Sequence, residues 1–118
     1  MAEHAGEDEE EVGEAVDDAH GVGVLVCVSG GDEDVIYRFD WRNGTATLSD
    51  SIALAVKPKG KDGTRYPAGI ALSPDGRTLY AAENLADSLA VVDLASRRVV
   101  QRLATERYPY GVVVGPDG

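Results

Sequence analysis

The sequence predicts an all-β fold made of short antiparallel strands grouped into four-stranded units. From Gly21 onward, short apolar runs alternate with turn residues, which is typical of many short strands. The chain has 118 residues, 43% of them apolar, with 14 glycines and 5 prolines, so we expect one small domain rich in turns. One eleven-residue segment also occurs twice, and this repeat indicates the architecture.

The first 20 residues form an acidic leader. They hold nine of the 21 acidic residues and no Lys or Arg, so the remaining 98 residues carry a net charge of −1. A block of like charge buries no core, and we expect residues 1–20 to be disordered. A short helix over residues 7–19 is the alternative, although like charges four residues apart oppose it. The leader lacks the basic and apolar regions of a signal peptide, and the localisation stays open.

Residues 21–56 form a first blade-like unit. Val24–Ser29 and Val35–Asp40 are apolar runs that predict two of its strands. The dipeptide at residues 43–44, Asn-Gly, is a strong hairpin signal. It joins the second of these strands to a further one near Thr45–Leu54.

The repeat places Tyr66–Gly76 and Tyr108–Gly118 at an offset of 42 residues, with six of eleven positions identical. A four-stranded propeller blade has a period of about 42 residues. Four strands fit between the two copies, at Gly69–Ser73, Thr78–Ala82, Ser88–Asp93 and Arg98–Leu103. The sequence therefore predicts a partial β-propeller of about two and a half blades within 21–118, with a second unit at 66–107 and a truncated one from 108.

The second unit also predicts core residues. Its third strand is nearly all apolar, which is typical of a strand buried on both faces. We therefore expect Leu79, Leu89, Val91 and Val92 to be buried between sheets.

The segment Leu79–Asn84, followed by Ser88–Leu94, resembles the repeat of YVTN-type seven-bladed β-propellers. The match covers about residues 21–118, and it departs from the family pattern at residues 81–83. The loop at 82–88 and the segment Arg107–Gly111 are most similar to propellers that precede an alkaline-phosphatase-like phosphoesterase domain. This resemblance implies a seven-bladed ring when complete and relatives that are often periplasmic or extracellular. The phosphoesterase domain it implies would lie beyond Gly118.

The sequence gives no catalytic, cofactor-binding or metal-binding residue. It has no Gly-x-Ser-x-Gly motif, no histidine after His20 and a single cysteine, which excludes an internal disulfide and a cysteine-based zinc site. We interpret Cys27 as a buried thiol and Ser29–Asp32 as a loop between strands, with an anion-binding turn as the alternative. Turn formation accounts for Asp75 and Asp117. The other features have plain structural interpretations too: a packing cluster at Tyr37, Phe39 and Trp41, and a solvated basic loop at Lys57, Lys59, Lys61 and Arg65.

These observations favour a non-catalytic propeller module that serves as a scaffold or interaction surface. Its expected partners are the remaining blades or a downstream domain. The net charge of −10 argues against nucleic-acid and anionic-lipid partners, and no apolar run is long enough to span a membrane. The alternative is the N-terminal part of a hydrolase, a phosphoesterase fusion or a propeller lactonase, with catalytic residues beyond Gly118.

Overall fold

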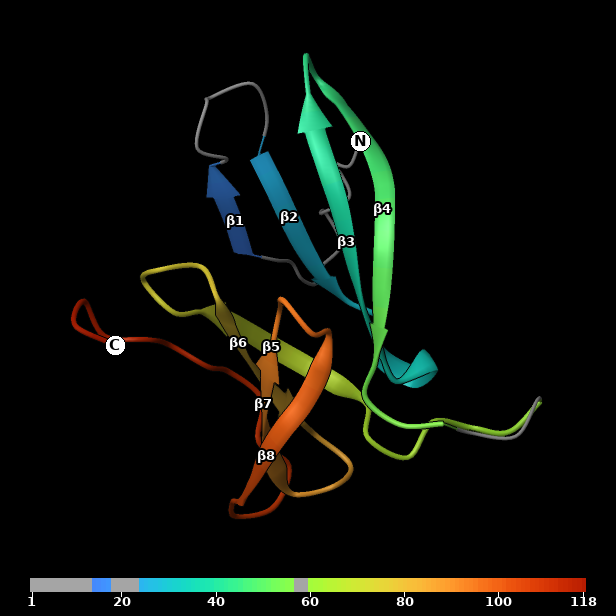
Figure 1. Cartoon of the computed structure of the whole chain (residues 1–118). Helices are drawn as coiled ribbons and strands as arrows, with labels where there is room; N and C mark the ends of the chain where they lie inside the picture. Colours follow the sequence, from blue (N-terminus) through green and yellow to red (C-terminus); the bar gives the residue numbers. More distant parts are fainter. Residues whose placement is uncertain (1–13, 18–23, 57–59) are drawn as a thin grey trace.

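The chain folds into two four-stranded antiparallel sheets that follow one another along the sequence (Figure 1). The computed structural model describes residues 14–17, 24–56 and 60–118. In each sheet the strands lie in chain order, as in a meander. The first sheet contains β1 (Glu14–Asp17), β2 (Val24–Ser29), β3 (Val35–Arg42) and β4 (Thr45–Ala53), and the second contains β5 (Pro67–Leu72), β6 (Thr78–Glu83), β7 (Ser88–Asp93) and β8 (Arg98–Ala104).

The second sheet confirms the strands expected for the repeat unit. β7 has the expected bounds, and the other three strands agree to within two residues. The turn after β5 forms because Asp75 accepts hydrogen bonds from the Ser73 hydroxyl at 2.6 Å and from the Arg77 amide at 3.0 Å. Gly76 completes the turn with a positive φ of 71°.

The first sheet confirms the expected hairpin. β3 and β4 meet at Asn43 and Gly44, which have positive φ angles of 51° and 78°. Two such residues make the kind of turn whose twist suits a two-residue hairpin. A short 3-10 helix, η2 (Gly31–Glu33), connects β2 to β3.

The expectation of disorder through residue 20 is wrong for four residues, because Glu14–Asp17 form β1. β1 pairs antiparallel with β2, from Glu14 opposite Cys27 to Asp17 opposite Val24. This pairing satisfies backbone groups that β2 would otherwise expose at the edge of the sheet. A helix over residues 7–19 is excluded at the same four positions, and the rest of the leader lies outside the described residues.

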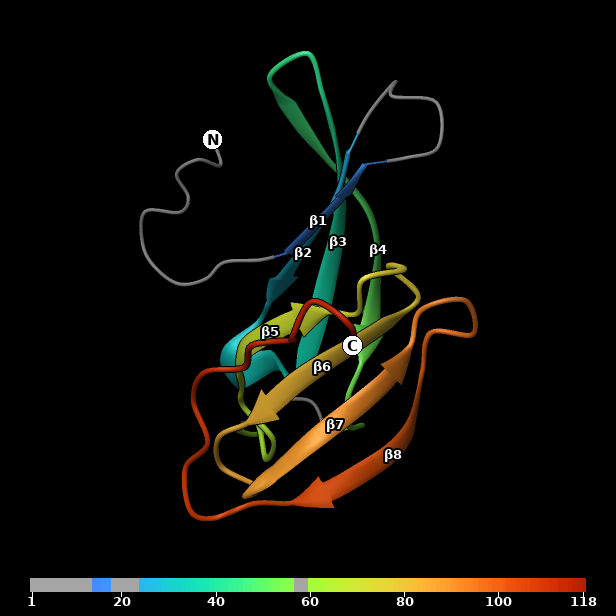
Figure 2. The same cartoon turned by 90° about the vertical axis from the view of Figure 1, so that its left-hand side faces the viewer.

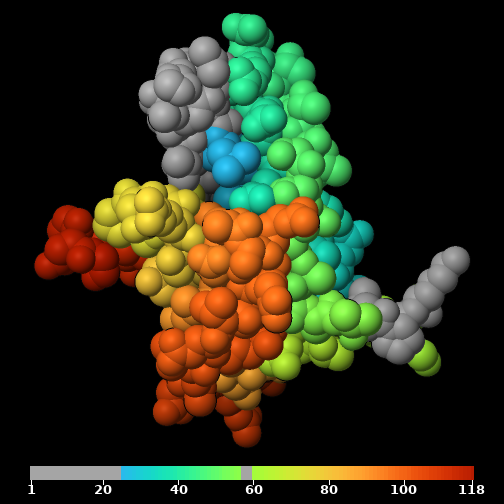
Figure 3. All heavy atoms as spheres, viewed as in Figure 1, coloured from blue at the N-terminus to red at the C-terminus, as the bar shows by residue number. Residues whose placement is uncertain are grey.

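The two sheets pack on each other through one apolar core. The first sheet and the residue after β4 contribute Cys27, Ile36, Ile52 and Leu54, and the second sheet and the residue after β7 contribute Ile70, Leu79, Ala81, Ala90, Val92 and Leu94. Figure 2 shows the second sheet crossing below the first, and Figure 3 shows their side chains in contact. Two adjacent four-stranded sheets with a shared core correspond to two neighbouring propeller blades.

The expected core is confirmed at Leu79 and Val92, which are fully buried. It is wrong at Leu89 and Val91, which are only partly buried. Along β7 the buried and partly buried residues alternate, with Ser88, Ala90 and Val92 on the buried side. The prediction assumed cover on both faces, whereas the first sheet covers only one.

The segment from Tyr108 onward begins a third copy of the repeat. Its turn recurs, because the Gly118 amide donates to the Gly115 carbonyl at 3.1 Å as the Gly76 amide donates to Ser73 at 2.9 Å. The segment lies beside β5, where the Gly69 amide donates to the Tyr110 carbonyl at 2.7 Å. A Cβ atom on Gly69 would come within 2.3 Å of that oxygen, so the close approach requires glycine here.

Candidate functional site

Four connections come together on one side of the two sheets, which we call the loop face. They are the β2–β3 connection at 30–34, the β4–β5 connection at 54–66, the β6–β7 turn at 84–87 and the segment 105–109 after β8. Backbone hydrogen bonds join them: Leu54 donates to Asp34 at 2.8 Å, Asn84 to Tyr66 at 3.1 Å and Thr105 to Asp87 at 2.9 Å. The loop face is therefore one connected surface.

Asp34 fixes the loop that leads into the second sheet. It is fully buried and has a left-handed backbone with φ of 59°. Its carboxylate accepts hydrogen bonds from the amides of Thr64 at 2.8 Å, Arg65 at 2.9 Å and Tyr66 at 2.8 Å. A buried carboxylate with several amide donors is well satisfied, so Asp34 acts as a latch between the blades.

Asp87 repeats this latch at the next blade boundary. It lies 53 residues after Asp34 and also has a positive φ, 50°. Its carboxylate accepts a hydrogen bond from the Tyr108 amide at 3.0 Å. Tyr66 and Tyr108 are repeat-equivalent and share a left-handed backbone, with φ of 54° and 55°. Asp34 therefore holds the tyrosine that precedes β5, and Asp87 holds the equivalent tyrosine at the start of the third repeat copy.

Glu83 ends β6 next to the loop face, and its side chain is 0% exposed, as buried as Asp34. It accepts hydrogen bonds from Arg102 Nε at 2.9 Å and Nη2 at 3.0 Å, and from the Ser88 hydroxyl at 2.6 Å. Arg65 Nη1 lies 3.7 Å from the same carboxylate. Arg102 also donates to the Leu54 carbonyl at 2.6 Å, so this buried ion pair ties the second sheet to the end of the first.

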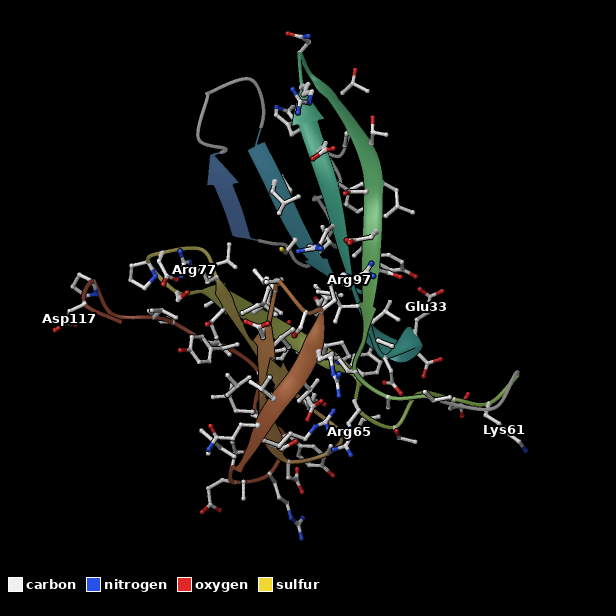
Figure 4. All side chains as sticks on the ribbon, in the orientation of Figure 1. Glu33, Lys61, Arg65, Arg77, Arg97 and Asp117 are labelled. Atoms are coloured by element: carbon white, nitrogen blue, oxygen red, sulfur yellow. The ribbon has the colours of Figure 1, made fainter. Side chains whose placement is uncertain are left out.

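A second ion pair lies at the junction of the sheets. Arg38 binds Asp50 with two hydrogen bonds of 2.7 Å, and it donates to the Leu94 carbonyl at 3.3 Å. Arg97 reaches the same carboxylate at 3.3 Å, and Figure 4 shows it between the two sheets. Hydrogen bonding to Arg38 lowers the pKa of Asp50 below its ordinary value.

The structural interpretations of several other residues are confirmed. Cys27 is fully buried. Ser29 ends β2, and residues 30–32 belong to the connection to β3. Asp32 accepts a hydrogen bond from the Gly63 amide at 2.8 Å. The expected cluster of Tyr37, Phe39 and Trp41 is confirmed for one pair, since Tyr37 and Phe39 form a tilted ring pair with centroids 6.5 Å apart. The Tyr37 hydroxyl donates to Glu33, and this hydrogen bond raises the pKa of Tyr37.

The basic loop is described only in part, because Lys57 and Lys59 lie outside the described residues. Lys61 is exposed at the tip of a projecting loop, whereas Arg65 is half-buried near Glu83 (Figure 4). The expected solvation is therefore seen at Lys61, whereas Arg65 is only partly exposed. Both histidines also lie outside that part.

The aspartates in turns are held by local hydrogen bonds. The Ser73 hydroxyl is the main cause that lowers the pKa of Asp75, and hydrogen bonding to Ser96 lowers that of Asp93. Asp117 lies in the repeated turn near the C-terminus, on the same side as Arg77 (Figure 4). Within the described ranges, no three His, Cys, Asp or Glu residues are grouped to hold a metal ion. The same residues include no helix long and apolar enough to cross a membrane.

Residues 18–118 match the model of a family described as lactonase, 7-bladed beta-propeller. This match covers β2 to β8 and the third repeat copy, and it begins just after β1. The chain belongs to this family. The expected propeller fold is thereby confirmed, with the described sheets as two of its blades. A search among curated proteins finds no relative of this lactonase-family propeller.

Two solved structures share the fold of the lactonase-family propeller. Kuenenia stuttgartiensis hydrazine synthase matches with a TM-score of 0.65 and 22% identity over 88% of this chain and 26% of that one. A putative 6-phosphogluconolactonase from Bacteroides fragilis matches with a TM-score of 0.61 and 20% identity over 89% of this chain and 29% of that one. This chain therefore spans less than a third of the length of either protein.

Sequence reasoning missed the loop-face latches. Asp34 and Tyr66 are 32 residues apart, and nothing local links them. A signal did exist, because Asp34 and Asp87 share the 53-residue offset that also relates Asp40 to Asp93. Glu83 carried no comparable signal, since its partner Arg102 lies 19 residues away on another strand.

Proposed function

We propose that this chain is a non-catalytic two-blade module of a lactonase-type propeller, and that it acts as a scaffold or interaction surface. The supporting observation is how three acidic groups at the loop face are used. The carboxylates of Asp34, Glu83 and Asp87 each accept hydrogen bonds from the chain itself. Groups that hold loops in place serve structure, and a fold by itself does not give a reaction.

The second candidate function is lactone hydrolysis by a longer protein that contains these blades. The match of residues 18–118 to the lactonase family favours it, as does the fold of the putative 6-phosphogluconolactonase from Bacteroides fragilis. In this proposal the two blades supply part of the wall around a central channel, and residues beyond Gly118 supply the catalytic groups.

The finer resemblance to YVTN-type repeats remains part of the proposal. It is supported by Leu79–Asn84 and Ser88–Leu94, which form β6, the following loop and β7 with the expected order and spacing. If a phosphoesterase domain follows, the propeller serves as its scaffold and the downstream domain is its partner.

The test is hydrolysis by the purified 118-residue chain. p-Nitrophenyl phosphate and a simple lactone are each assayed with added Zn²⁺, Mg²⁺ or Ca²⁺, against a metal-only blank. We expect no turnover above the blank. Turnover that follows the protein peak on a sizing column, and that is lost in Asp40→Asn or Asp93→Asn, would overturn the non-catalytic role.

A further inference from the structure

Two tyrosines on the loop face have a strained backbone. Tyr66 and Tyr108 have φ angles of 54° and 55°, in the left-handed region that a bulky residue rarely adopts. Glycine would take this conformation without strain, yet both equivalent positions of the repeat hold tyrosine. Strain that the surrounding structure maintains is typical of functional positions, so the reason for tyrosine here lies in its side chain.

The two latches hold each tyrosine by its backbone. The Tyr66 amide donates to the Asp34 carboxylate at 2.8 Å, and the Tyr108 amide donates to the Asp87 carboxylate at 3.0 Å. The two phenol rings are therefore presented from fixed points. A ligand that binds them would not have to order the loops that carry them, which lowers the cost of binding.

Both phenol rings are open to a ligand. Tyr66 is 42% exposed and Tyr108 is 62% exposed, and within the described part of the chain neither hydroxyl has a hydrogen-bond partner. The Tyr66 ring is supported by η2, since a Cβ atom on Gly31 would lie 3.5 Å from a ring carbon. Tyr66 stands at a junction where both sheets are present, so its exposure does not depend on the blades that follow.

The β6–β7 turn joins the two tyrosines into one surface. The Asn84 amide donates to the Tyr66 carbonyl at 3.1 Å, and the Asn84 side chain donates to the Pro109 carbonyl at 3.1 Å. The next residue, Leu85, is 51% exposed. We call Tyr66, Leu85 and Tyr108 the aromatic row.

Charges of both signs surround the aromatic row. The charged residues of the loop face that are at least partly exposed are Asp32, Glu33, Lys61, Asp62, Arg65, Asp87, Glu106 and Arg107. A strongly charged ligand would be attracted by some of these groups and repelled by the others. A hydroxyl group both donates and accepts hydrogen bonds, so it can pair with carboxylates and guanidinium groups alike. The surroundings therefore favour an uncharged ligand that is rich in hydroxyl groups.

We propose that the aromatic row binds a neutral glycan chain made of hexose rings. A hexose ring has an apolar C–H face that can pack on a phenol ring, while its hydroxyl groups face water and the charged residues. Tyrosine suits such a surface because its ring is apolar at one end and polar at the other. The repeat presents one tyrosine at each of two successive blade boundaries, which matches a ligand that is itself made of repeated rings. The proposal rests on the role as an interaction surface proposed above and gives that surface its partner.

The test is isothermal titration calorimetry of the full 118-residue chain with cellohexaose and with maltohexaose. We expect one of these neutral hexose chains to bind, with an affinity that is the same at low and high salt because the ligand carries no charge. Tyr66→Gly and Tyr108→Gly should each lower the association constant about three- to tenfold, the usual effect of losing one aromatic contact. Leu48→Ala is the control, because Leu48 is exposed on β4 and lies outside the aromatic row.

Urea unfolding of the same variants separates binding from structure. Glycine relieves the strain at a positive φ, so the Tyr66→Gly and Tyr108→Gly variants should unfold at a urea concentration no lower than that of the wild type. Weaker binding without weaker folding would show that the rings serve the ligand. If a glycine variant does not fold, the matching alanine variant takes its place in the titration.

Four outcomes would overturn the proposal. They are no binding of either glycan, binding that both glycine variants retain in full, a lower unfolding midpoint in both glycine variants, and preferential binding of deca-proline or polygalacturonate. The third outcome would mean that the rings support the fold, and the fourth would indicate a peptide or an anionic partner. Hydrolysis is a separate readout, so turnover would contradict the non-catalytic role without changing the binding result.

Discussion

Removal of the Arg102 guanidinium is the most informative perturbation of the loop face. Glu83 is 0% exposed and Arg102 is 31% exposed, so Arg102→Ala leaves the carboxylate buried without its main cation. Breaking one partner of a buried ion pair typically costs about 3–5 kcal/mol. Two other groups still contact the Glu83 carboxylate in this variant: Arg65 Nη1 at 3.7 Å and the Ser88 hydroxyl at 2.6 Å. We therefore expect Arg102→Ala to lower the free energy of unfolding by about 3 kcal/mol, near the lower end of this range.

The assay is urea unfolding at neutral pH, followed by circular dichroism and by Trp41 fluorescence. Arg98→Ala is the matched control, because Arg98 is an exposed arginine on the same strand, and surface changes usually alter stability by about 0.5 kcal/mol or less. The double variant Glu83→Leu with Arg102→Leu should recover much of the loss, since it removes the uncompensated charge. A loss below about 1 kcal/mol for Arg102→Ala, or no recovery in the double variant, would refute the reasoning.

Three further predictions concern packing, pH and the C-terminal segment. Leu79→Ala should cost about 2–5 kcal/mol in urea unfolding and Leu89→Ala clearly less, because only Leu79 is fully buried; equal losses would contradict this. The lowered pKa of Asp50 means that its ion pair stabilises the fold above about pH 4 and loses this effect as the pH falls. The stability advantage of the wild type over Asp50→Asn should therefore shrink on acidification, and a constant difference would contradict it. Gly69→Ala should displace the Tyr110 carbonyl and speed proteolysis after residue 107, whereas unchanged cleavage would show that the close approach is not needed.

The strands were predictable because their signals are local. Alternating apolar residues and the Asn43–Gly44 and Pro74–Gly76 turns set the elements of both sheets, and the 42-residue repeat set their grouping. β1 was not predictable, since its acidic composition favours solvent and the strand forms by backbone pairing with β2.

The burial of side chains and the hydrogen bonds of the loop face depend on contacts between residues that are far apart in the sequence. The periodicity of β7 does not say how many neighbouring sheets are present, and Leu89 therefore seemed as buried as Leu79. The hydrogen bond that the Tyr66 amide donates to Asp34 forms only when the two blades stand side by side. The hydrogen bonds that Arg102 donates to Glu83 join two strands of the second sheet that are not neighbours in the chain. Such pairings require the fold before they can be recognised.

The arrangement of the two sheets as packed neighbouring blades is tested most directly by methyl–methyl nuclear Overhauser effects. The account predicts cross-peaks between the methyl groups of Ile36, Ile52 or Leu54 and those of Leu79, Val92 or Leu94, because these residues share one buried core. Cross-peaks confined to each sheet, with none between the two groups in a folded sample, would contradict the account.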